Sequence, residues 1–378
     1  MVGEEVLIKG IARRGARTKE LVKKLQPNEI AIISHEDIDE LAARSLVKSK
    51  VRAVINASSS ITGKYPHRGP VVLIESGIPV LDQVGADIFE QINDGMEIRI
   101  KDKDIYSGHN KLGQGRLLNK EIIEKRFHQA EENYSLQLGK FINNTLEYAA
   151  KELDLVDREL EIPDIKLNFK GCHTLIVVRG KNYLDDLNVI RPYINEIKPI
   201  LIGVDGGADA LRSFGYCPHL IIGDMDSISD ETLKCGAELI VHAYPDGRAP
   251  GMERILSLGL KASVLPAPGT SEDAAMLLAY QLGTELIVAV GTHSNVIDFL
   301  EKGRNGMAST FLVRMKVGAI LVDAKGVSKL YRQKLKFRYI AQLVIAAFIP
   351  FIIVSLISPT ASQFLRLFYM KVRIFLRI

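Results

Sequence analysis

Two short turns combine glycines with carboxylates in a spacing that suits phosphate and metal chemistry. The first is Gly203-Val204-Asp205-Gly206-Gly207-Ala208, and the second is Gly223-Asp224-Met225-Asp226-Ser227. Each follows an apolar run, residues 200–202 and 220–222, that predicts a short buried strand. Open α/β sheets bind ligands at the carboxyl ends of their strands. We therefore predict that Asp205, Asp224 and Asp226 surround one crevice.

Carboxylates two positions apart on a tight turn can share a hard cation, and Mg²⁺ with a polyphosphate is the usual guest. Asp224 and Asp226 are the predicted metal ligands, and Gly206, Gly207 and Ser227 complete the predicted binding turns. The alternative is that the glycines only turn the chain and the aspartates cap helices.

The start of a predicted helix, residues 274–282, offers a third acidic position. Thr270 and Ser271 place hydroxyls at its N-terminus, where a phosphate is favoured. Thr270 with Asp273 also fits a capping box, although Asp is shorter than the preferred Glu. Capping alone leaves Glu272 unexplained, so Asp273 is kept as a candidate catalytic residue.

Two more loops carry candidate ligand contacts. Asp246 and Arg248 lie on a turn where the arginine could grip phosphate with a bidentate fork, or could simply be solvated. Thr292 and His293 follow a predicted strand, and the histidine could bind a base, sugar or phosphate, or cap the next helix. A basic glycine turn, residues 302–306, could merely end a helix.

The surrounding pattern predicts an α/β fold in five parts. Residues 1–118 form a small α/β domain, and residues 119–165 form a long helix and linker, with an apolar stripe at helical spacing up to about Val156. In residues 166–332, strand and helix patterns alternate, which predicts a mainly parallel sheet with helices on both faces. Residues 338–358 form a transmembrane helix, and residues 359–378 form a basic amphipathic tail.

Composition and charge narrow the cellular setting. The chain has 378 residues, a net charge of +4 and three cysteines without a CxxC pair. The small net charge argues against nucleic acid as a partner, and the cysteine usage indicates a reduced cytosolic body. Basic residues flank the apolar stretch on both sides, more densely before it, so the bulk of the chain is expected in the cytoplasm as a single-pass cell-membrane protein. A re-entrant hairpin and a buried soluble helix are the alternatives.

The acidic turns carry a resemblance to a known enzyme family. Asp-Gly-Gly-Ala at 205–208 and Gly-Asp-Met-Asp-Ser at 223–227 resemble the two acidic motifs of thiamin pyrophosphokinase. The resemblance implies that Asp205, Asp224, Asp226 and Asp273 bind Mg²⁺ and ATP, or another nucleotide, and place the diphosphoryl group. Two features depart from that family: no second β-rich domain follows residue 330, and its later Gly-Gly-Arg-x-Asp-His signature is reduced to Gly-Thr-His-Ser-Asn.

The chain as a whole is more similar to the SteA-type cytokinetic ring proteins of Gram-positive bacteria. The stretches at 242–251, 269–279, 306–312 and 322–327 carry that likeness. It implies a membrane-bound division factor at the septum, working with a small membrane partner, and we expect a homodimer. Two functions stay open: a membrane-tethered nucleotide-binding division protein, or an active pyrophosphokinase that transfers diphosphate from ATP.

Overall fold

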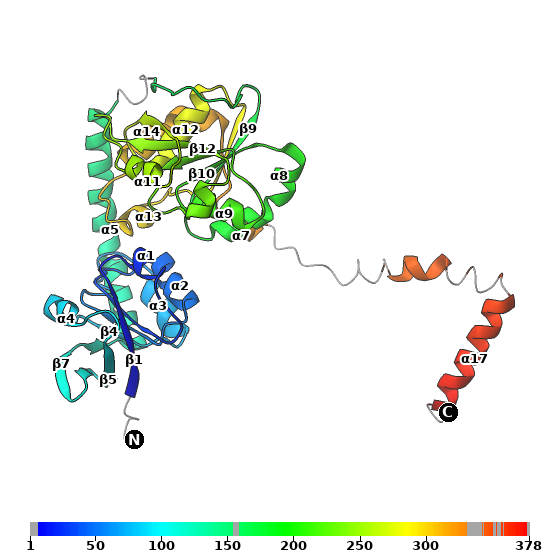
Figure 1. The fold of residues 1–378 in the computed structure, drawn as a ribbon, viewed down its shortest axis with the longest axis horizontal. Coiled ribbons are helices and arrows are strands. Elements are labelled where there is room, and N and C mark those ends of the chain that lie inside the picture. The colour runs from blue at the N-terminus through cyan, green and yellow to red at the C-terminus, as the bar shows by residue number, and fades with distance from the viewer. Residues whose placement is uncertain are drawn as a thin grey trace. The chain divides into compact units, whose positions relative to one another are not determined.

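The computed structural model describes residues 7–153, 159–330, 342, 344–350, 353, 357 and 359–375. The chain divides into two compact units, Met1–Val327 and Ser328–Ile378. The first unit contains two β-sheets (Figure 1). We call the regions around them the N-terminal lobe, residues 7–118, and the parallel-sheet lobe, residues 166–327.

The N-terminal lobe is built on a mixed sheet with strand order β7-β6-β5-β1-β2-β3-β4-β8. Strands β1 to β4 are parallel, whereas β5, β6, β7 and β8 pair antiparallel. The bounds are β1 Leu7–Gly15, β2 Ile30–Ile33, β3 Ala53–Asn56, β4 Val80–Asp82, β5 Glu97–Lys101, β6 Asp104–Ser107, β7 Asn110–Gln114 and β8 Arg116–Leu117; its helices are α1 Thr18–Leu21, α2 Glu40–Lys48, α3 Gly69–Glu75 and α4 Ala86–Gln91.

A long helix, α5 (Lys120–Lys151), follows the N-terminal lobe. The Asn119 side chain caps it by accepting the Ile122 backbone N–H at 2.9 Å. Its 32 residues span roughly 48 Å at 1.5 Å per residue. The helix contacts α3 of the first lobe and α14 of the second, so its apolar stripe is covered within the chain. The sequence predicted a helix to about Val156, a residue that lies outside the described ranges.

The parallel-sheet lobe has strand order β13-β12-β11-β10-β9-β14-β15, and every pair of neighbours is parallel. This confirms the predicted α/β fold with a parallel sheet. The strands are β9 His173–Val177, β10 Ile200–Val204, β11 Leu220–Gly223, β12 Glu238–Ala243, β13 Ser263–Pro266, β14 Leu286–Val290 and β15 Leu321–Asp323.

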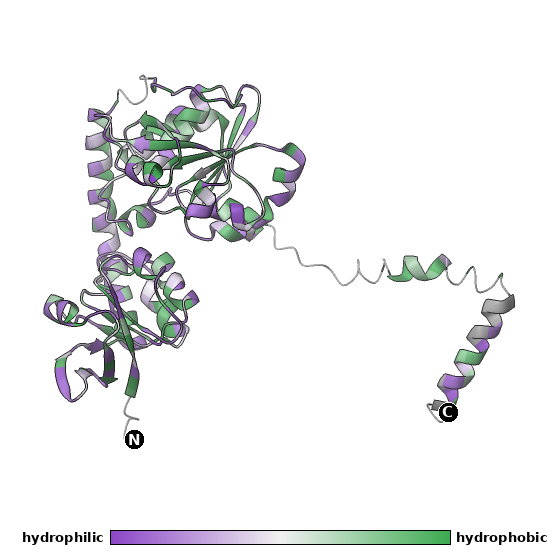
Figure 2. Ribbon diagram, viewed as in Figure 1, coloured by the Kyte–Doolittle hydropathy of each residue, from purple (hydrophilic) through white to green (hydrophobic). Residues whose placement is uncertain are grey.

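Helices cover both faces of this sheet. One core joins strand residues such as Ile202 and Ile222 to α12, α14 and the end of α5. The opposite face packs Leu201 and Ile221 under α7, α8, α9, α10 and α11. Figure 2 shows hydrophobic strands surrounded by helices of mixed colour. The bounds are α7 Tyr183–Val189, α8 Arg191–Ile197, α9 Gly207–Ser213, α10 Asp230–Leu233, α11 Gly251–Ser257, α12 Ser271–Gln281, α13 Val296–Leu300, α14 Ala308–Val317, η1 Gly318–Ile320 and α15 Val327–Leu330.

The C-terminal unit corrects one prediction. Its helix α17 runs over Pro359–Phe375 and carries exposed Arg366, Lys371 and Arg373. Much of the predicted transmembrane helix, residues 338–358, lies outside the described residues. Within the part that the structure describes, no helix is both long enough and apolar enough to cross a bilayer. The fold prediction was therefore wrong in including a C-terminal transmembrane helix: an apolar composition had been taken for a continuous helix, which the described residues do not form.

Candidate functional site

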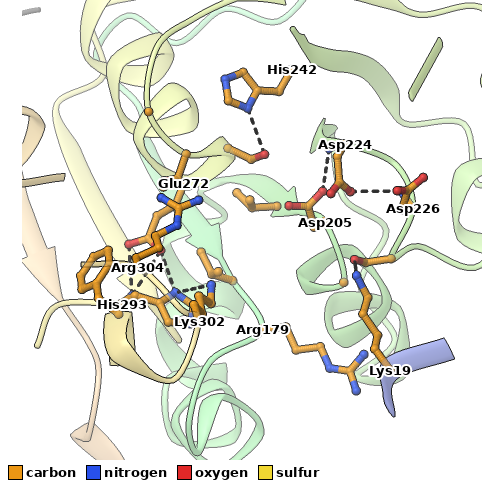
Figure 3. Close-up of a pocket in the computed structure, with 18 of the residues that line it drawn as sticks. Lys19, Arg179, Asp205, Asp224, Asp226, His242, Glu272, His293, Lys302 and Arg304 are labelled. Carbon is orange, nitrogen blue, oxygen red and sulfur yellow. Dashed lines mark hydrogen bonds and ion pairs between the residues drawn. The ribbon is translucent and has the colours of Figure 1, made fainter. Parts of the chain in front are cut away.

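A cleft of about 1130 Å³ lies at the carboxyl ends of the strands in the parallel-sheet lobe. Residues that follow β9, β10, β11, β12, β13 and β14 all line it, which is where parallel sheets bind ligands. Residues 16–19 and several residues between 34 and 45 of the N-terminal lobe also line it, among them Lys19, His35 and Asp39. The cleft is therefore bounded by two lobes that are far apart in the sequence (Figure 3).

The three predicted carboxylates lie together in this cleft. Asp205 follows β10 with a left-handed φ of 47°, and Asp224 follows β11, the parallel neighbour of β10. The Asp224 backbone N–H donates to Asp205 Oδ1 at 2.9 Å, and the Asp226 N–H donates to Asp224 Oδ1 at 3.1 Å (Figure 3). Asp224 and Asp226 are exposed, and both line the cleft with Asp205 and Ser227.

Gly206, Gly207 and Gly223 allow the chain to make these turns. A Cβ at Gly223 would lie 1.8 Å from Asp205 Oδ1, so the carboxylate occupies the space that a side chain would need. A Cβ at Gly207 would lie 1.9 Å from the Val177 carbonyl oxygen. Both glycines are therefore required by close backbone approach. Gly206 lines the cleft itself.

Two side chains behind the cleft hold the second acidic turn. Asp209 on α9 accepts hydrogen bonds from the Ser229 hydroxyl at 2.6 Å and from its backbone N–H. Arg254 on α11 donates to the carbonyl oxygens of Met225 and Ile228 and to the Asp230 carboxylate. These contacts fix the backbone on both sides of Asp226, so the open carboxylates are presented by a rigid turn.

Burial and a neighbouring charge raise the proton affinity of Asp205. Desolvation first, then the negative charge of the Asp224 side chain and a hydrogen bond with it, raise the pKa of Asp205 to about 7, although the Asp224 backbone N–H acts to lower it. The positive charge of Lys19 acts in the opposite direction. Asp205 is thus poised near neutral pH, whereas a solvated carboxyl stays ionised there.

Five lysine or arginine side chains line the same cleft: Arg17, Lys19, Arg179, Lys302 and Arg304, of which Figure 3 labels the last four. Arg179 follows β9, and its Cδ would lie 3.1 Å from a Cβ added at Gly206. Its Nε is buried and has no hydrogen-bond partner among the residues that the structure describes. Desolvation lowers the pKa of Lys302, against the opposing charge of Glu272. A cleft that holds open carboxylates and several cations can bind an anion and its counter-cation together.

The third acidic position is built differently. The Asp273 carboxylate is fully buried, and its Oδ2 accepts from the Thr270 N–H and the hydroxyls of Ser309 and Thr310, each at 3.0 Å. Thr270 and Asp273 form the predicted capping box of α12. Asp273 is not among the residues lining the cleft, whereas Thr270, Ser271 and Glu272 are. Burial raises the pKa of Asp273, followed by the charge of Glu272.

Glu272, which capping left unexplained, binds the loop after β14. It accepts from the His293 backbone N–H, and its Oε2 lies 3.2 Å from His293 Nδ1. Arg314 Nη2 lies 3.7 Å from the other carboxylate oxygen. Asn295, and not His293, caps the following helix α13. His293 therefore lines the cleft with its orientation set by a buried carboxylate.

The remaining predicted contacts are engaged elsewhere. The hydroxyl of buried Thr292 donates to the Asp323 carboxylate at 3.1 Å. Arg248 Nε donates to Asp246 Oδ2 at 2.7 Å, and its guanidinium lies over the Tyr244 ring. None of Thr292, Asp246 and Arg248 is among the residues lining the cleft. Ser271 lines it, with its hydroxyl 3.1 Å from His242 Nδ1.

The donor set was tested for a divalent cation. Among the residues that the structure describes, no group of three or more His, Cys, Asp or Glu side chains is arranged to hold a metal ion alone. Mg²⁺ does not need such a cage, because it is commonly bound by one or two carboxylates together with substrate phosphates and water. The exposed oxygens of Asp224 and Asp226 fit that requirement.

Sequence reasoning missed the cations of the cleft. Arg179 directly follows an apolar run and precedes Gly180. A charged residue next to a glycine at the end of a predicted strand is a signal that could have marked it as a site residue. Lys302 and Arg304 lie on the basic glycine turn, which was interpreted as a helix end. Lys19 had no local signal at all.

The model of the thiamin pyrophosphokinase catalytic domain matches residues 192–247, which include both acidic turns. The model of the SteA-like C-terminal domain matches residues 325–376. Both resemblances stated from the sequence are thereby confirmed for those stretches. The comparison with curated proteins finds no match.

One solved structure among the matches is a thiamine pyrophosphokinase from Bacillus subtilis. It is 22% identical, and the match covers 40% of this chain and 58% of that one, with a TM-score of 0.25. The chain therefore spans less than two thirds of that relative's length. At this TM-score the match supports no conclusion about the cleft.

Proposed function

We propose that the parallel-sheet lobe binds a nucleotide polyphosphate, such as ATP, together with Mg²⁺. The observation that carries the proposal is the pairing of open carboxylates with cations in one cleft. Asp224 and Asp226 are exposed at the end of β11, while Arg179, Lys302 and Arg304 line the same cavity. The match of residues 192–247 to a catalytic domain that is named for pyrophosphokinase activity supports the same ligand class.

Asp224 and Asp226 would hold the Mg²⁺, which would neutralise part of the phosphate charge. Arg179 would supply the fixed fork that suits phosphate oxygens, because its Nε is buried without a partner. Lys302 and Arg304 would neutralise the remaining negative charge. His293, held by Glu272, would present one ring edge to the ligand.

A second function, diphosphate transfer from ATP to a hydroxyl, is favoured by the position of Asp205, which lines the cleft and accepts the Asp224 backbone N–H beside the proposed metal position. The pKa of Asp205 is raised to about 7, which lies in the range suited to a general base at neutral pH. Asp205 would accept the proton of the acceptor hydroxyl as its oxygen attacks the β-phosphorus of ATP; the bond from that phosphorus to the oxygen of the α-phosphate would break, and AMP would leave. Binding without turnover is our first proposal, because the later signature motif of the pyrophosphokinase family is reduced here to Gly291-Thr292-His293-Ser294-Asn295.

We also propose a role in cell division at the septum. The support is the match of residues 325–376 to the SteA-like C-terminal domain, and the resemblance of the chain to SteA-type cytokinetic ring proteins. A homodimer and a small membrane partner belong to the same proposal. A fluorescent fusion expressed in a Gram-positive host should form a band at midcell, whereas uniform fluorescence would argue against this role.

Calorimetry on the purified full chain tests the binding proposal. The wild type should bind ATP only when Mg²⁺ is present, and Asp224→Asn should weaken that binding by about 100-fold, the size expected for loss of a charged metal ligand. Glu231→Gln, which removes an exposed carboxylate that does not line the cleft, is the matched control and should bind as the wild type does. AMP formation with thiamin, absent in Asp224→Asn, would instead establish diphosphate transfer.

A further inference from the structure

One cation of the cleft comes from the other lobe. Lys19 lies on α1 of the N-terminal lobe, yet its Nζ donates to the Ser227 hydroxyl, 208 positions along the chain (Figure 3). Ser227 ends the turn that presents Asp224 and Asp226. Lys19 is therefore held beside the proposed metal and phosphate position by a neutral hydroxyl.

The Lys19 ammonium forms no ion pair with a carboxylate among the described residues, although the neighbouring Arg17 pairs with Glu20 at 3.4 Å. The charge is nevertheless felt in the site, because Lys19 opposes the rise in the pKa of Asp205. A flexible ammonium on a hydroxyl partner can move to a phosphate oxygen without breaking an ion pair.

The position of α1 is set by its own lobe. Leu21 is buried in the core of the N-terminal lobe, and a Cβ at Gly15 would lie 2.8 Å from Leu21 Cβ. Thr18 Oγ1 lies 3.0 Å from His35 Nδ1, which fixes the start of the helix. Lys19, between these two anchored residues, is left exposed and lines the cleft.

A second contact joins the two lobes. Lys181, two residues after Arg179, forms an ion pair with Glu40 on α2. The Glu40 side chain is only 9% exposed and also accepts from Arg44 at 2.6 Å. Although burial opposes it, hydrogen bonding from Lys181 and Arg44 holds the pKa of Glu40 below its ordinary value. The loop that carries Arg179 is thus tied to the N-terminal lobe.

We propose that Lys19 is a phosphate-binding residue contributed by the N-terminal lobe, so that polyphosphate binding couples the two lobes. This inference rests on the proposed function. On binding, the Lys19 ammonium would donate to a phosphate oxygen in place of, or together with, the Ser227 hydroxyl. The ligand would then bridge α1 to the turn after β11, and any partner of the N-terminal lobe would sense whether the cleft is filled.

Affinity measurements on the full chain test the contact. Titrations with Mg²⁺–ATP and with magnesium tripolyphosphate compare the wild type, Lys19→Ala, Lys19→Gln, Lys23→Ala and Asp224→Asn. Lys23 is an exposed lysine just past α1 that does not line the cleft, so its variant removes the same charge from the same segment. Lys19→Ala and Lys19→Gln should bind both ligands about 10- to 100-fold more weakly, the size expected for one charge-assisted hydrogen bond. Lys23→Ala should change affinity less than twofold.

Hydrogen exchange tests the coupling in the same samples. In the wild type, magnesium tripolyphosphate should slow exchange in residues 16–22 as well as in residues 224–229, and Lys19→Gln should lose only the first effect. If Lys19→Ala and Lys19→Gln bind as Lys23→Ala does while Asp224→Asn does not bind, Lys19 is no ligand and the inference is overturned with the proposed function intact. If the wild type binds neither compound, both are overturned.

Discussion

Two acidic regions at the carboxyl edge of the same sheet differ in the exposure of their carboxylates. In the turn after β11, Asp224 and Asp226 are exposed and face the cleft. At the start of α12, Asp273 is fully buried and accepts three hydrogen bonds from groups of its own lobe. Both regions follow a glycine-rich strand end, so acidity and position alone do not distinguish them.

The difference lies in what surrounds each carboxylate. Helix α14 brings Ser309 and Thr310 over Asp273, and both hydroxyls donate to its Oδ2. Among the described residues, no side-chain hydroxyl donates to the carboxylates of Asp224 and Asp226 in this way, because Asp209 and Arg254 hold the backbone of their turn from behind. Of the two acidic turns, the one that stays open to a ligand is the one whose neighbours bind its main chain and not its carboxylates.

The largest expected effect is on stability at the covered position. Asp273→Ala leaves the Thr270 N–H and two hydroxyls without their acceptor, and the Thr310 hydroxyl among them is buried, where an unsatisfied group costs about 1–3 kcal/mol. We expect a loss of about 2–4 kcal/mol in the free energy of unfolding, measured by urea denaturation. Asp224→Asn should stay within about 0.5 kcal/mol of the wild type because the side chain is exposed. Equal losses in the two variants would remove the contrast between the regions.

A smaller effect is expected for Arg179, on affinity. Arg179→Ala removes a guanidinium whose buried Nε lacks a partner, so Mg²⁺–ATP should bind about 10- to 50-fold more weakly. Arg179→Lys should recover only part of that affinity, because an ammonium lacks the planar fork. The check is calorimetry on both variants, and full affinity in Arg179→Ala would place the phosphates elsewhere in the cleft.

Asp205 predicts a pH dependence of stability. Its pKa is raised from an ordinary value of 3.8 to about 7, so between these values the folded chain keeps a proton that the unfolded chain releases. Stability should therefore fall as pH rises from about 4 to 7, by at most ~1.4 kcal/mol per pH unit for one proton. Burial raises the pKa of Glu301 to about 7 as well, which adds a slope of the same sign.

Asp205→Asn should remove only the part of this pH dependence of stability that Asp205 causes, and Glu301→Gln should remove the part that Glu301 causes. Urea denaturation at a series of pH values measures both. An unchanged slope in Asp205→Asn would show that this carboxyl titrates normally, and the case for a general base at this position would then fail.

The smallest effect is expected at Arg248, the predicted phosphate ligand that pairs with Asp246. Arg248→Ala should change Mg²⁺–ATP affinity less than twofold and stability by less than about 0.5 kcal/mol, since the pair is exposed and local. A tenfold loss of Mg²⁺–ATP affinity on titration would instead show that the Asp246–Arg248 turn contacts the ligand. The binding site would then include the turn after β12 as well as the turn after β11.

The sequence was sufficient for the parts of the site that depend on parallel strands alone. Alternating strand and helix patterns predicted the sheet, and parallel strands bring their carboxyl ends to one edge, so Asp205, Asp224 and Asp226 were placed together correctly. The spacing of Thr270 and Asp273 also predicted the capping box. These features need only local pattern and sheet geometry.

The rest depended on packing between distant segments. Asp273 is covered by α14, which begins 35 positions later, and nothing near Asp273 in the sequence announces that cover. Lys19 reaches the cleft only because two lobes are neighbours in the folded chain. The apolar stretch at 338–358 led to the opposite error, a predicted membrane-spanning helix that the described residues do not show. Apolar composition alone does not establish such a helix.

The most direct test locates the metal itself. Crystals of the full chain with Mn²⁺ and a non-hydrolysable ATP analogue would show the ion by its anomalous scattering. The account predicts a peak about 2.1 Å from a carboxylate oxygen of Asp224 or Asp226, with the phosphates directed toward Arg179. A peak at Glu272 or Asp273, or a nucleotide bound outside the cleft, would contradict it.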